Sequence, residues 1–205
     1  MKDDFPRLTF DPGRHLTRVL MQQGRVPLEA DWNEQAAILL HYIERLAADL
    51  IGQHGGPEGQ EAFAIGAIAN QATVTDLTIG SGRYYVDGLL CENLDAEATY
   101  FTQPDLPLDR DKDKLPAGTF LAYLDVWERP VTAVEDDSLR QAAQDGPDTA
   151  TRGRVVWQVR VTDRIPGGIE HRFAPLALLV DGKSVPLRKS FKPLVAVQAP
   201  PARGS

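Results

Sequence analysis

Five carboxylates in one stretch of the chain could perform acid–base chemistry: Asp125, Glu128, Glu135, Asp136 and Asp137. Glycoside hydrolases place a pair of such groups on either side of the bond they cleave. Acids at strand ends and helix starts also have a structural explanation, because negative charge near a helix N-terminus is stabilising. The spacing does not place two of these side chains across a sugar. We therefore keep glycoside hydrolysis as the least favoured alternative and predict that the chain is not an enzyme.

A second acidic pattern is similar to the start of a calcium-binding loop. Asp109, Asp111 and Asp113 alternate as in an EF-hand, but that loop needs glycine at its sixth position and glutamate at its twelfth. Lys114 and Phe120 occupy those two positions. We predict a solvated loop of mixed charge instead of a calcium site.

The histidines and the single cysteine also lack the spacing of a reactive site. Cys91 has no context that marks a nucleophile, and we expect it to be a small core or sheet residue. The Gly80-Ser81-Gly82 run continues into a strand-like segment, whereas a phosphate-binding loop continues into a helix. No metal-ligand spacing relates the four histidines, which are His15, His41, His54 and His171. We predict no catalytic residue, no metal site and no cofactor.

One long amphipathic helix is the strongest structural pattern. It is predicted to begin after Pro27 and to end near Gly52, a length of about 36 Å. Apolar residues recur in it at steps of four and three, namely Trp32, Ala36, Leu39, Ile43, Leu46 and Leu50. Leu40 and Ala47 widen the stripe. Two interpretations remain open: the stripe packs on a sheet of its own chain, or it associates with copies of itself around a symmetry axis.

The rest of the chain is predicted to be mainly β. Alternating or β-branched apolar residues indicate strands at 73–79, 83–90, 119–127 and 154–162. Asp87-Gly88 and Asp181-Gly182 are candidate hairpin turns, although the first could also lie within a strand. A short helix is expected at 137–144, and 103–116 is expected to be irregular.

These elements predict an α+β fold. An N-terminal extended arm and the long amphipathic helix occupy residues 1–52, and a mainly antiparallel β-sandwich or distorted barrel occupies 53–198. Residues 199–205 are expected to form a tail.

Composition limits the partners. The chain has 205 residues, 42% of them hydrophobic, and a net charge of −7. This charge leaves no basic surplus to meet phosphate, so we expect no nucleic-acid partner. Acids occupy the first residues where a signal peptide needs an apolar core, and we expect no membrane insertion. We predict that the protein is cytoplasmic when made, and that lysis or assembly into a particle would carry it out of the cell.

Several segments resemble a family of bacterial and phage proteins called domains of unknown function. They are DFPRLTFDPGRH (4–15), VLMQQGRVPLEADWNEQ (19–35), GRYYVDGLLCEN (82–93), LDVWER (124–129) and GPDTATRGRVVWQV (146–159). Members often belong to phage-tail or contractile-injection gene clusters. The spacing of Gly24-Arg25-Val26 and Asn33-Glu34 is also similar to the opening of phage tail-fibre and baseplate attachment domains. Such a resemblance implies anchoring of a fibre or spike, commonly as a trimer.

The segment 19–34 also has a mechanical interpretation. The candidate structural or interface residues are Gly24, Arg25, Asp31, Trp32, Asn33 and Glu34. Gly24 permits a tight turn, and Arg25 could bind carbonyl groups or an acid at the start of the helix. Asp31, Asn33 and Glu34 would place polar groups around Trp32, which we expect to be buried in the core. The segment would thus convert an extended arm into a helix.

We therefore predict a non-catalytic structural or attachment component of a phage-tail-like or contractile-injection particle, a homo-oligomer with a trimer favoured. Its other partners would be tail or baseplate proteins, and its final location a virion or tail-like particle. The alternative is a carbohydrate-binding module that stacks sugars on an exposed row of aromatic rings. Its candidate rings are Tyr84, Tyr85, Tyr100, Trp127 and Trp157.

Overall fold

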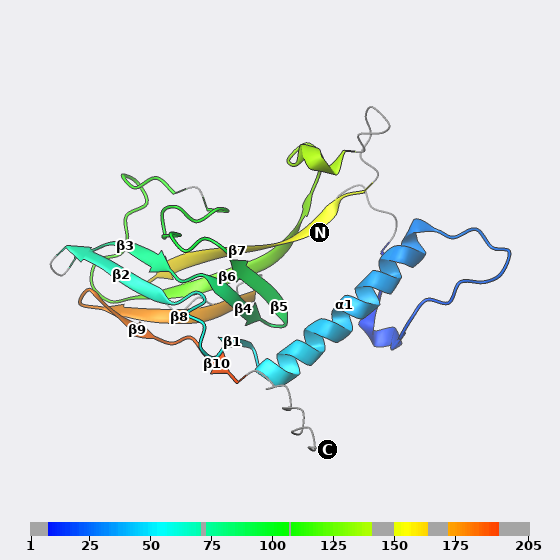
Figure 1. Cartoon of the computed structure of the whole chain (residues 1–205), viewed down its shortest axis with the longest axis horizontal. Coiled ribbons are helices and arrows are strands. Elements are labelled where there is room, and N and C mark those ends of the chain that lie inside the picture. Colours follow the sequence, from blue (N-terminus) through cyan, green and yellow to red (C-terminus); the bar gives the residue numbers. More distant parts are fainter. Residues whose placement is uncertain (1–7, 71–72, 107, 141–149, 164–171, 193–205) are drawn as a thin grey trace, which may run out of the picture.

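The computed structural model shows a β-rich body from which one long helix projects (Figure 1). The structure describes residues 8–70, 73–106, 108–140, 150–163 and 172–192. The expected tail at 199–205 and His171 lie outside the described residues.

Helix α1 (Glu29–Ile51) confirms the predicted long helix. At its start, a carboxylate oxygen of Asp31 accepts a hydrogen bond from the backbone N–H of Leu28 at 3.3 Å. The helix ends where the N–H of Gly52, at a φ of +89°, bonds the carbonyl of Ala48. The arm before it contains one 3-10 turn, η1 (Pro12–Arg14), capped by Asp11. Sequence pattern and structure therefore agree on the extent of the helix.

The body is made of strands that form three sheets in the described residues. The strands are β1 (His54–Pro57), β2 (Ile65–Asn70), β3 (Thr73–Ile79), β4 (Gly82–Val86), β5 (Leu89–Asn93), β6 (Phe120–Val131), β7 (Arg152–Thr162), β8 (Arg172–Val180), β9 (Lys183–Pro186) and β10 (Ser190–Phe191). The sheet orders are β10-β1-β4-β5, β2-β3 and β7-β6-β8-β9. Every pairing is antiparallel except that of β1 with β10.

The turn chemistry explains two of the hairpins. Asp87 and Gly88 both have positive φ, as do Asp181 and Gly182. Two-residue hairpin loops favour this left-handed backbone, because it matches the twist of the flanking strands. Both candidate turns are therefore confirmed, and the segment expected as one strand at 83–90 is divided into β4 and β5.

One hydrophobic core receives side chains from all three sheets. Leu77 of β3, Tyr84 of β4 and Leu124 of β6 are fully buried in it. The ring of Trp157 on β7 packs edge-on against Phe63 with ring centroids 5.0 Å apart. The described residues thus form one long helix and a mostly β body of three sheets, which agrees in part with the predicted α+β class, and the described strands form no closed barrel.

The expected helix at 137–144 is wrong in its described part. Residues Asp137–Leu139 form a single 3-10 turn, η2, and Asp136 caps it through the N–H of Ser138. Arg140 already has an extended backbone. Residues 141–144 lie outside the described part of the chain.

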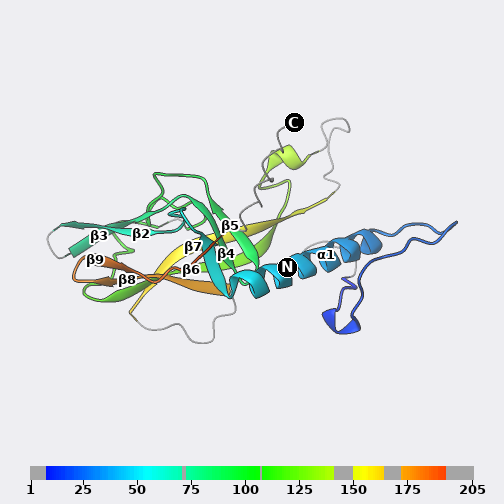
Figure 2. The same cartoon turned by 60° about the horizontal axis from the view of Figure 1, so that its bottom comes forward.

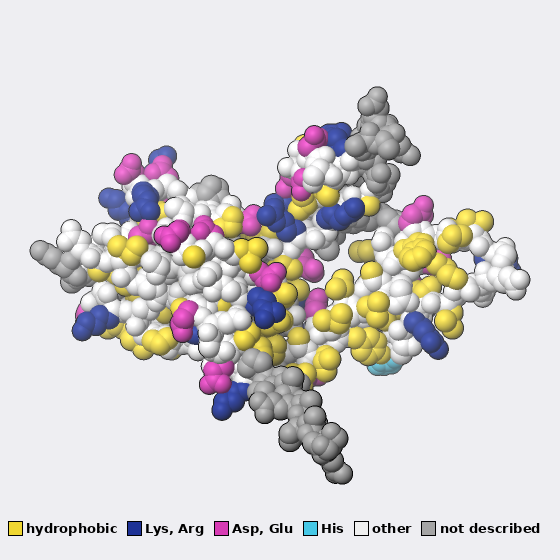
Figure 3. All heavy atoms as spheres, viewed as in Figure 1, with side chains coloured by type: hydrophobic (Ala, Val, Ile, Leu, Met, Phe, Trp, Pro, Cys, Tyr) yellow, Lys and Arg dark blue, Asp and Glu magenta, His cyan; other side chains and the backbone are white. Residues whose placement is uncertain are grey.

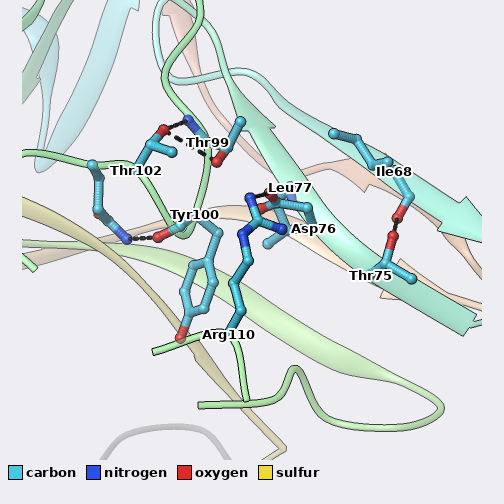
Figure 4. Close-up of polar contacts among 9 residues, drawn as sticks. Ile68, Thr75, Asp76, Leu77, Thr99, Tyr100, Thr102 and Arg110 are labelled. Atoms are coloured by element: carbon cyan, nitrogen blue, oxygen red, sulfur yellow. Dashed lines mark hydrogen bonds and ion pairs between the residues drawn. The ribbon is translucent and has the colours of Figure 1, made fainter. Parts of the chain in front are cut away.

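The irregular segment between β5 and β6 is fixed to the body by a charge pair (Figure 4). Arg110 donates to a carboxylate oxygen of Asp76 on β3 at 2.6 Å, and Asp76 is 4% exposed. The other oxygen of Asp76 accepts from the N–H of Leu77, and the guanidinium of Arg110 lies 4.7 Å from the ring centre of Phe101. The segment expected as a solvated loop thus supplies a partner for a buried acid.

Gln103 connects the same segment to the outer edge of β7. Its side-chain oxygen accepts from the N–H of Val159 at 2.7 Å, and its amide nitrogen donates to the carbonyls of Val159 and Tyr100. The side chain is buried and copies the hydrogen bonding of a neighbouring strand.

Replacing Gln103 by alanine should lower the free energy of unfolding by about 2–4 kcal/mol. The change leaves the N–H and carbonyl of Val159 without this partner, and each unsatisfied buried polar group costs about 1–3 kcal/mol. Urea unfolding of the variant measures the loss. The exposed Gln53→Ala is the control and should change stability by less than about 0.5 kcal/mol. Equal stability of the two variants would contradict the role of Gln103.

His54 of β1 should make stability depend on pH. Burial, and then the charge of Lys189, lower the pKa of His54 below its ordinary 6.5, and its Nδ1 lies 3.0 Å from the hydroxyl of Tyr84. As pH falls through 6.5, the unfolded chain takes up this proton before the folded chain does, so the free energy of unfolding decreases. Denaturant unfolding between pH 7.5 and 5 should show this decrease and a smaller one in His54→Gln. Identical pH profiles would contradict the assignment.

Candidate interaction surface

The predicted apolar stripe of α1 faces solvent along its whole length. We call its six residues, Trp32, Ala36, Leu39, Ile43, Leu46 and Leu50, the seam. Leu46 is 60% exposed and Leu50 is 72% exposed, and Ala36 is exposed as well. Figure 3 shows hydrophobic side chains gathered along the helix. In a single chain the seam therefore has no sheet to pack on.

The expectation that Trp32 is buried in the core is wrong for the single chain. Trp32 is 66% exposed, and it lies at the end of α1 away from β1 and β4 (Figure 2). Amphipathic spacing identifies an apolar face but does not say whether its partner belongs to the same chain. In the described residues, the stripe therefore does not pack on a sheet of its own chain.

The N-terminal arm covers a different face of the helix. The ring of Phe10 packs on His41 with centroids 5.5 Å apart, and the N–H of Val19 donates to the side-chain oxygen of Gln35 at 2.9 Å. The hydroxyl of Thr9 donates to a carboxylate oxygen of Glu34. Ile38, the one buried residue of α1, lies roughly 120° around the helix from the centre of the seam. The arm thus fills one face and leaves the seam open.

The C-terminal half of α1 is held to the body by the β4–β5 turn. Arg172 at the start of β8 donates to Glu44 at 3.1 Å and to the carbonyl of Asp87 at 3.3 Å. The N–H of Asp87 donates to the carbonyl of Gln53 at 2.7 Å. Gly88 lies so close that a Cβ there would be 2.2 Å from the carbonyl oxygen of Glu44. These contacts fix the direction in which the helix projects.

The predicted motif residues lie together at the outer end of the helix. Gly24 has a φ of +72°, and the N–H of Arg25 bonds the carbonyl of Gln22, which confirms the turn. The carboxylate of Asp31 accepts a hydrogen bond from the N–H of Leu28 at the start of the helix. Asn33 is exposed, and the side chain of Arg25 forms no hydrogen bond or ion pair within the described residues. The expected role of Arg25 at the start of the helix therefore has no support in these contacts.

A shallow cavity of about 470 Å³ separates the arm from the helix start. Val19, Met21, Val26 and Trp32 supply much of its apolar wall. Leu20 and Val26 of the arm are 71% and 82% exposed. The apolar surface of the seam thus continues onto the arm.

Four of the five acids considered for hydrolysis form local structural contacts, and the five do not converge on one site. Asp125 is buried and pairs with Arg160 at 3.2 Å, and Glu135 pairs with Arg129 at 2.6 Å. Asp137 pairs with Arg140. Asp136 caps η2, and Glu128 is exposed on β6.

The aromatic row required for carbohydrate stacking is not formed by the described strands. Tyr84, Tyr100 and Trp157 are buried, and Tyr85 and Trp127 are half-buried. The indole nitrogen of Trp157 donates to the carbonyl of Glu92 at 2.9 Å, so its polar edge is also occupied.

The remaining candidate groups have similar structural explanations. Asp109 pairs with Lys112 at 3.0 Å, and the described residues contain no group of three metal-ligating side chains. Burial raises the pKa of the Cys91 thiol to about 12, which keeps it in the unreactive thiol form at neutral pH.

The family model of DUF6519, a family of unknown function, matches residues 1–173. The chain belongs to this family. The match includes the arm, all of α1 and the strands up to the start of β8, so the seam and its anchoring contacts lie within the family's domain. No curated protein and no solved structure matches the chain. The family description assigns no function, and the tail-particle context stays a prediction.

The seam is recognisable in the sequence, whereas the residues that hold the helix in place are not. The Asp87-Gly88 pair signals a turn, and nothing in that signal indicates that the turn packs against Glu44. Arg172 follows a segment without clear pattern, and its partner is 128 residues away in the chain.

Proposed function

We propose that this protein is a non-catalytic structural subunit that assembles with copies of itself through the seam of α1, as a homotrimer. The observation that carries this proposal is an amphipathic helix whose whole apolar stripe is exposed in the single chain. Monomeric proteins rarely expose a large contiguous apolar surface, and such a surface marks an interaction site.

The seam has the geometry of a helical bundle. In heptad terms, Trp32, Leu39 and Leu46 occupy d positions, and Ala36, Ile43 and Leu50 occupy a positions. Leu40 and Ala47 add apolar e positions, and Leu40 is 54% exposed. An a and d stripe alone suits a two-stranded coil, whereas apolar a, d and e positions suit the wider core of a bundle. This width favours three helices over two.

The apolar area is large enough to drive association. Full burial of a leucine or isoleucine side chain contributes about 1.5–3 kcal/mol. Leu39, Ile43, Leu46 and Leu50 are 53–72% exposed, so burying what remains exposed would contribute on the order of 4–7 kcal/mol for each subunit. Ordering and rigid-body entropy offset part of this gain.

A membrane is a weaker explanation for the same surface. None of the helices in the described part of the chain has the length and apolar character that a bilayer crossing requires. The seam is a stripe, and Arg45 and Asp49 occupy other faces of α1.

The particle context of the proposal comes from the resemblance to proteins of phage-tail and contractile-injection gene clusters. In that context the three sheets, as a distorted sandwich, would serve as a rigid mount, and a bundle of three α1 helices would attach a fibre or spike to a baseplate. The heptad spacing of the seam and the turn at Gly24 support this proposal.

Affinity purification of the tagged full chain from producing cells tests this context. We expect sheath, tube or baseplate proteins to co-purify in fixed ratios and to be visible as particles by electron microscopy. A Leu46→Glu chain carrying the same tag is the control and should lose them. Recovery of the wild-type chain without any particle component would contradict the tail-particle role.

A further inference from the structure

A second surface lies on the β body, in a cavity of about 670 Å³ between β5 and β7. Both strands are at the edge of their sheets, β5 in the order β10-β1-β4-β5 and β7 in the order β7-β6-β8-β9 (Figure 1). The cavity is therefore bounded by two strand edges that have no neighbouring strand in the described residues.

The backbone of β5 presents free hydrogen-bonding groups to this cavity. In the two-residue hairpin, Val86 and Leu89 form the hydrogen-bonded pair next to the turn. Pairing alternates along an antiparallel ladder, so the N–H and C=O groups of Leu90 and Glu92 point away from β4. The indole of Trp157 bonds the carbonyl of Glu92. The other three groups have no partner within the described residues.

Strand β7 also has backbone N–H and C=O groups that point away from its neighbouring strand, β6. Gln103 bonds both the N–H and the C=O of Val159, which shows that this residue faces outward. Because the β6–β7 register has no shift, Val155 and Trp157 face outward as well. The four outward residues, Leu90, Glu92, Val155 and Trp157, all line the cavity.

The side chains around these edges combine apolar surface with negative charge. Leu94 is 89% exposed and Leu90 is 38% exposed. Glu92, Asp95 and Asp105 line the cavity together with one cation, Arg154. The charge of this lining favours a cationic partner.

We propose that the β5–β7 cavity binds an extended peptide segment of a partner protein in which basic and apolar side chains alternate. The segment adds as a strand, and its backbone bonds the outward groups of β5 or β7. Side chains alternate between the two faces of a strand, so the basic side chains of the segment all lie on the face of Glu92, near Asp95 and Asp105. Its apolar side chains lie on the other face, beside Val155 and Trp157. The bond between Gln103 and Val159 already copies such a strand further along the β7 edge. This surface is separate from the seam and does not require self-association.

Hydrogen exchange of the full chain tests the proposal. The probe is a capped six-residue peptide of alternating lysine and valine, and the control is the same peptide with glutamate in place of lysine. We expect the lysine peptide to slow exchange in fragments that contain Leu90 and Glu92, or Val155 and Trp157, because strand addition protects outward amides. The glutamate peptide should have no such effect.

Reversing the charge of one acid that lines the cavity gives a second test. Glu92→Lys should raise the half-saturating concentration of the lysine peptide roughly tenfold, equivalent to about 1.4 kcal/mol. The control Glu58→Lys changes an exposed acid that does not line the cavity and should leave the concentration unchanged. The proposal is overturned if the lysine peptide protects neither edge, if both peptides protect equally, or if the two variants bind alike.

Discussion

Replacing Leu46 by glutamate should convert the assembled protein into monomers. Leu46 is 60% exposed in the single chain, so the substitution removes little from the fold of the subunit. In a bundle through the seam it would place one carboxylate per chain in the apolar core. A buried unpaired charge costs several kcal/mol for each chain, and the burial of Leu46 is lost as well, so little of the gain that remains after ordering and rigid-body entropy would be left. Sedimentation velocity measures the change in mass.

Leu94→Glu is the matched control for this substitution. It makes the same chemical change at a residue that is 89% exposed and lies in the loop after β5. We expect this variant to remain assembled and both variants to keep the thermal unfolding of the body. Unchanged assembly of Leu46→Glu, or equal dissociation of the two variants, would contradict the role of the seam.

Replacing Gly88 by alanine should destabilise the protein by about 3 kcal/mol or more. A Cβ at this position would be 2.2 Å from the carbonyl oxygen of Glu44 and 2.7 Å from its Cα. Both atoms are backbone, so the helix or the hairpin must move. The φ of +84° adds strain of about 1–2 kcal/mol for any residue with a side chain. Urea unfolding measures the total.

Gly59→Ala is the control that distinguishes the steric contact with Glu44 from the backbone strain of a positive φ. Gly59 has nearly the same φ, +83°, but an added Cβ would meet nothing within 4 Å. The control should therefore lose only the strain energy. Hydrogen exchange in the last two turns of α1 should also accelerate in Gly88→Ala alone, because the Glu44–Arg172 pair weakens. Equal losses of stability would mean that Gly88 does not hold the helix.

The amphipathic helix and the hairpin turns could be predicted because their signals are local. A period of four and three residues identified both the extent of α1 and its apolar stripe. Asp-Gly pairs identified two turns, because few residues tolerate the positive φ that these turns require. The strands at 73–79, 119–127 and 154–162 were found within a few residues of their observed bounds.

Long-range partners could not be predicted from the same signals. The stripe of α1 has the same spacing whether it packs on a sheet or on another chain, and this ambiguity produced the wrong expectation for Trp32. The pairs Asp76–Arg110 and Glu44–Arg172 join residues that are distant in the sequence. Their side chains have no local pattern that distinguishes them from solvated charges.

The seam and the β5–β7 cavity also differ in whether the sequence can predict them. The seam is visible in the sequence because all its residues belong to one helix. The β5–β7 cavity is not, because it depends on two strand edges about 65 residues apart, brought together by the fold. Only the structure shows that Leu90 and Val155 face the same space.

Sedimentation equilibrium of the unmodified full chain tests self-association through α1 most directly. The mass of one chain is 22.5 kDa, and the proposed trimer has three times this mass, 3 × 22.5 = 67.5 kDa. We expect the 67.5 kDa species at micromolar concentrations, in equilibrium with monomer on dilution. A mass of 22.5 kDa at every concentration up to about 100 micromolar would contradict the central claim, and a limiting mass of 45 kDa, or 2 × 22.5, would contradict the trimer.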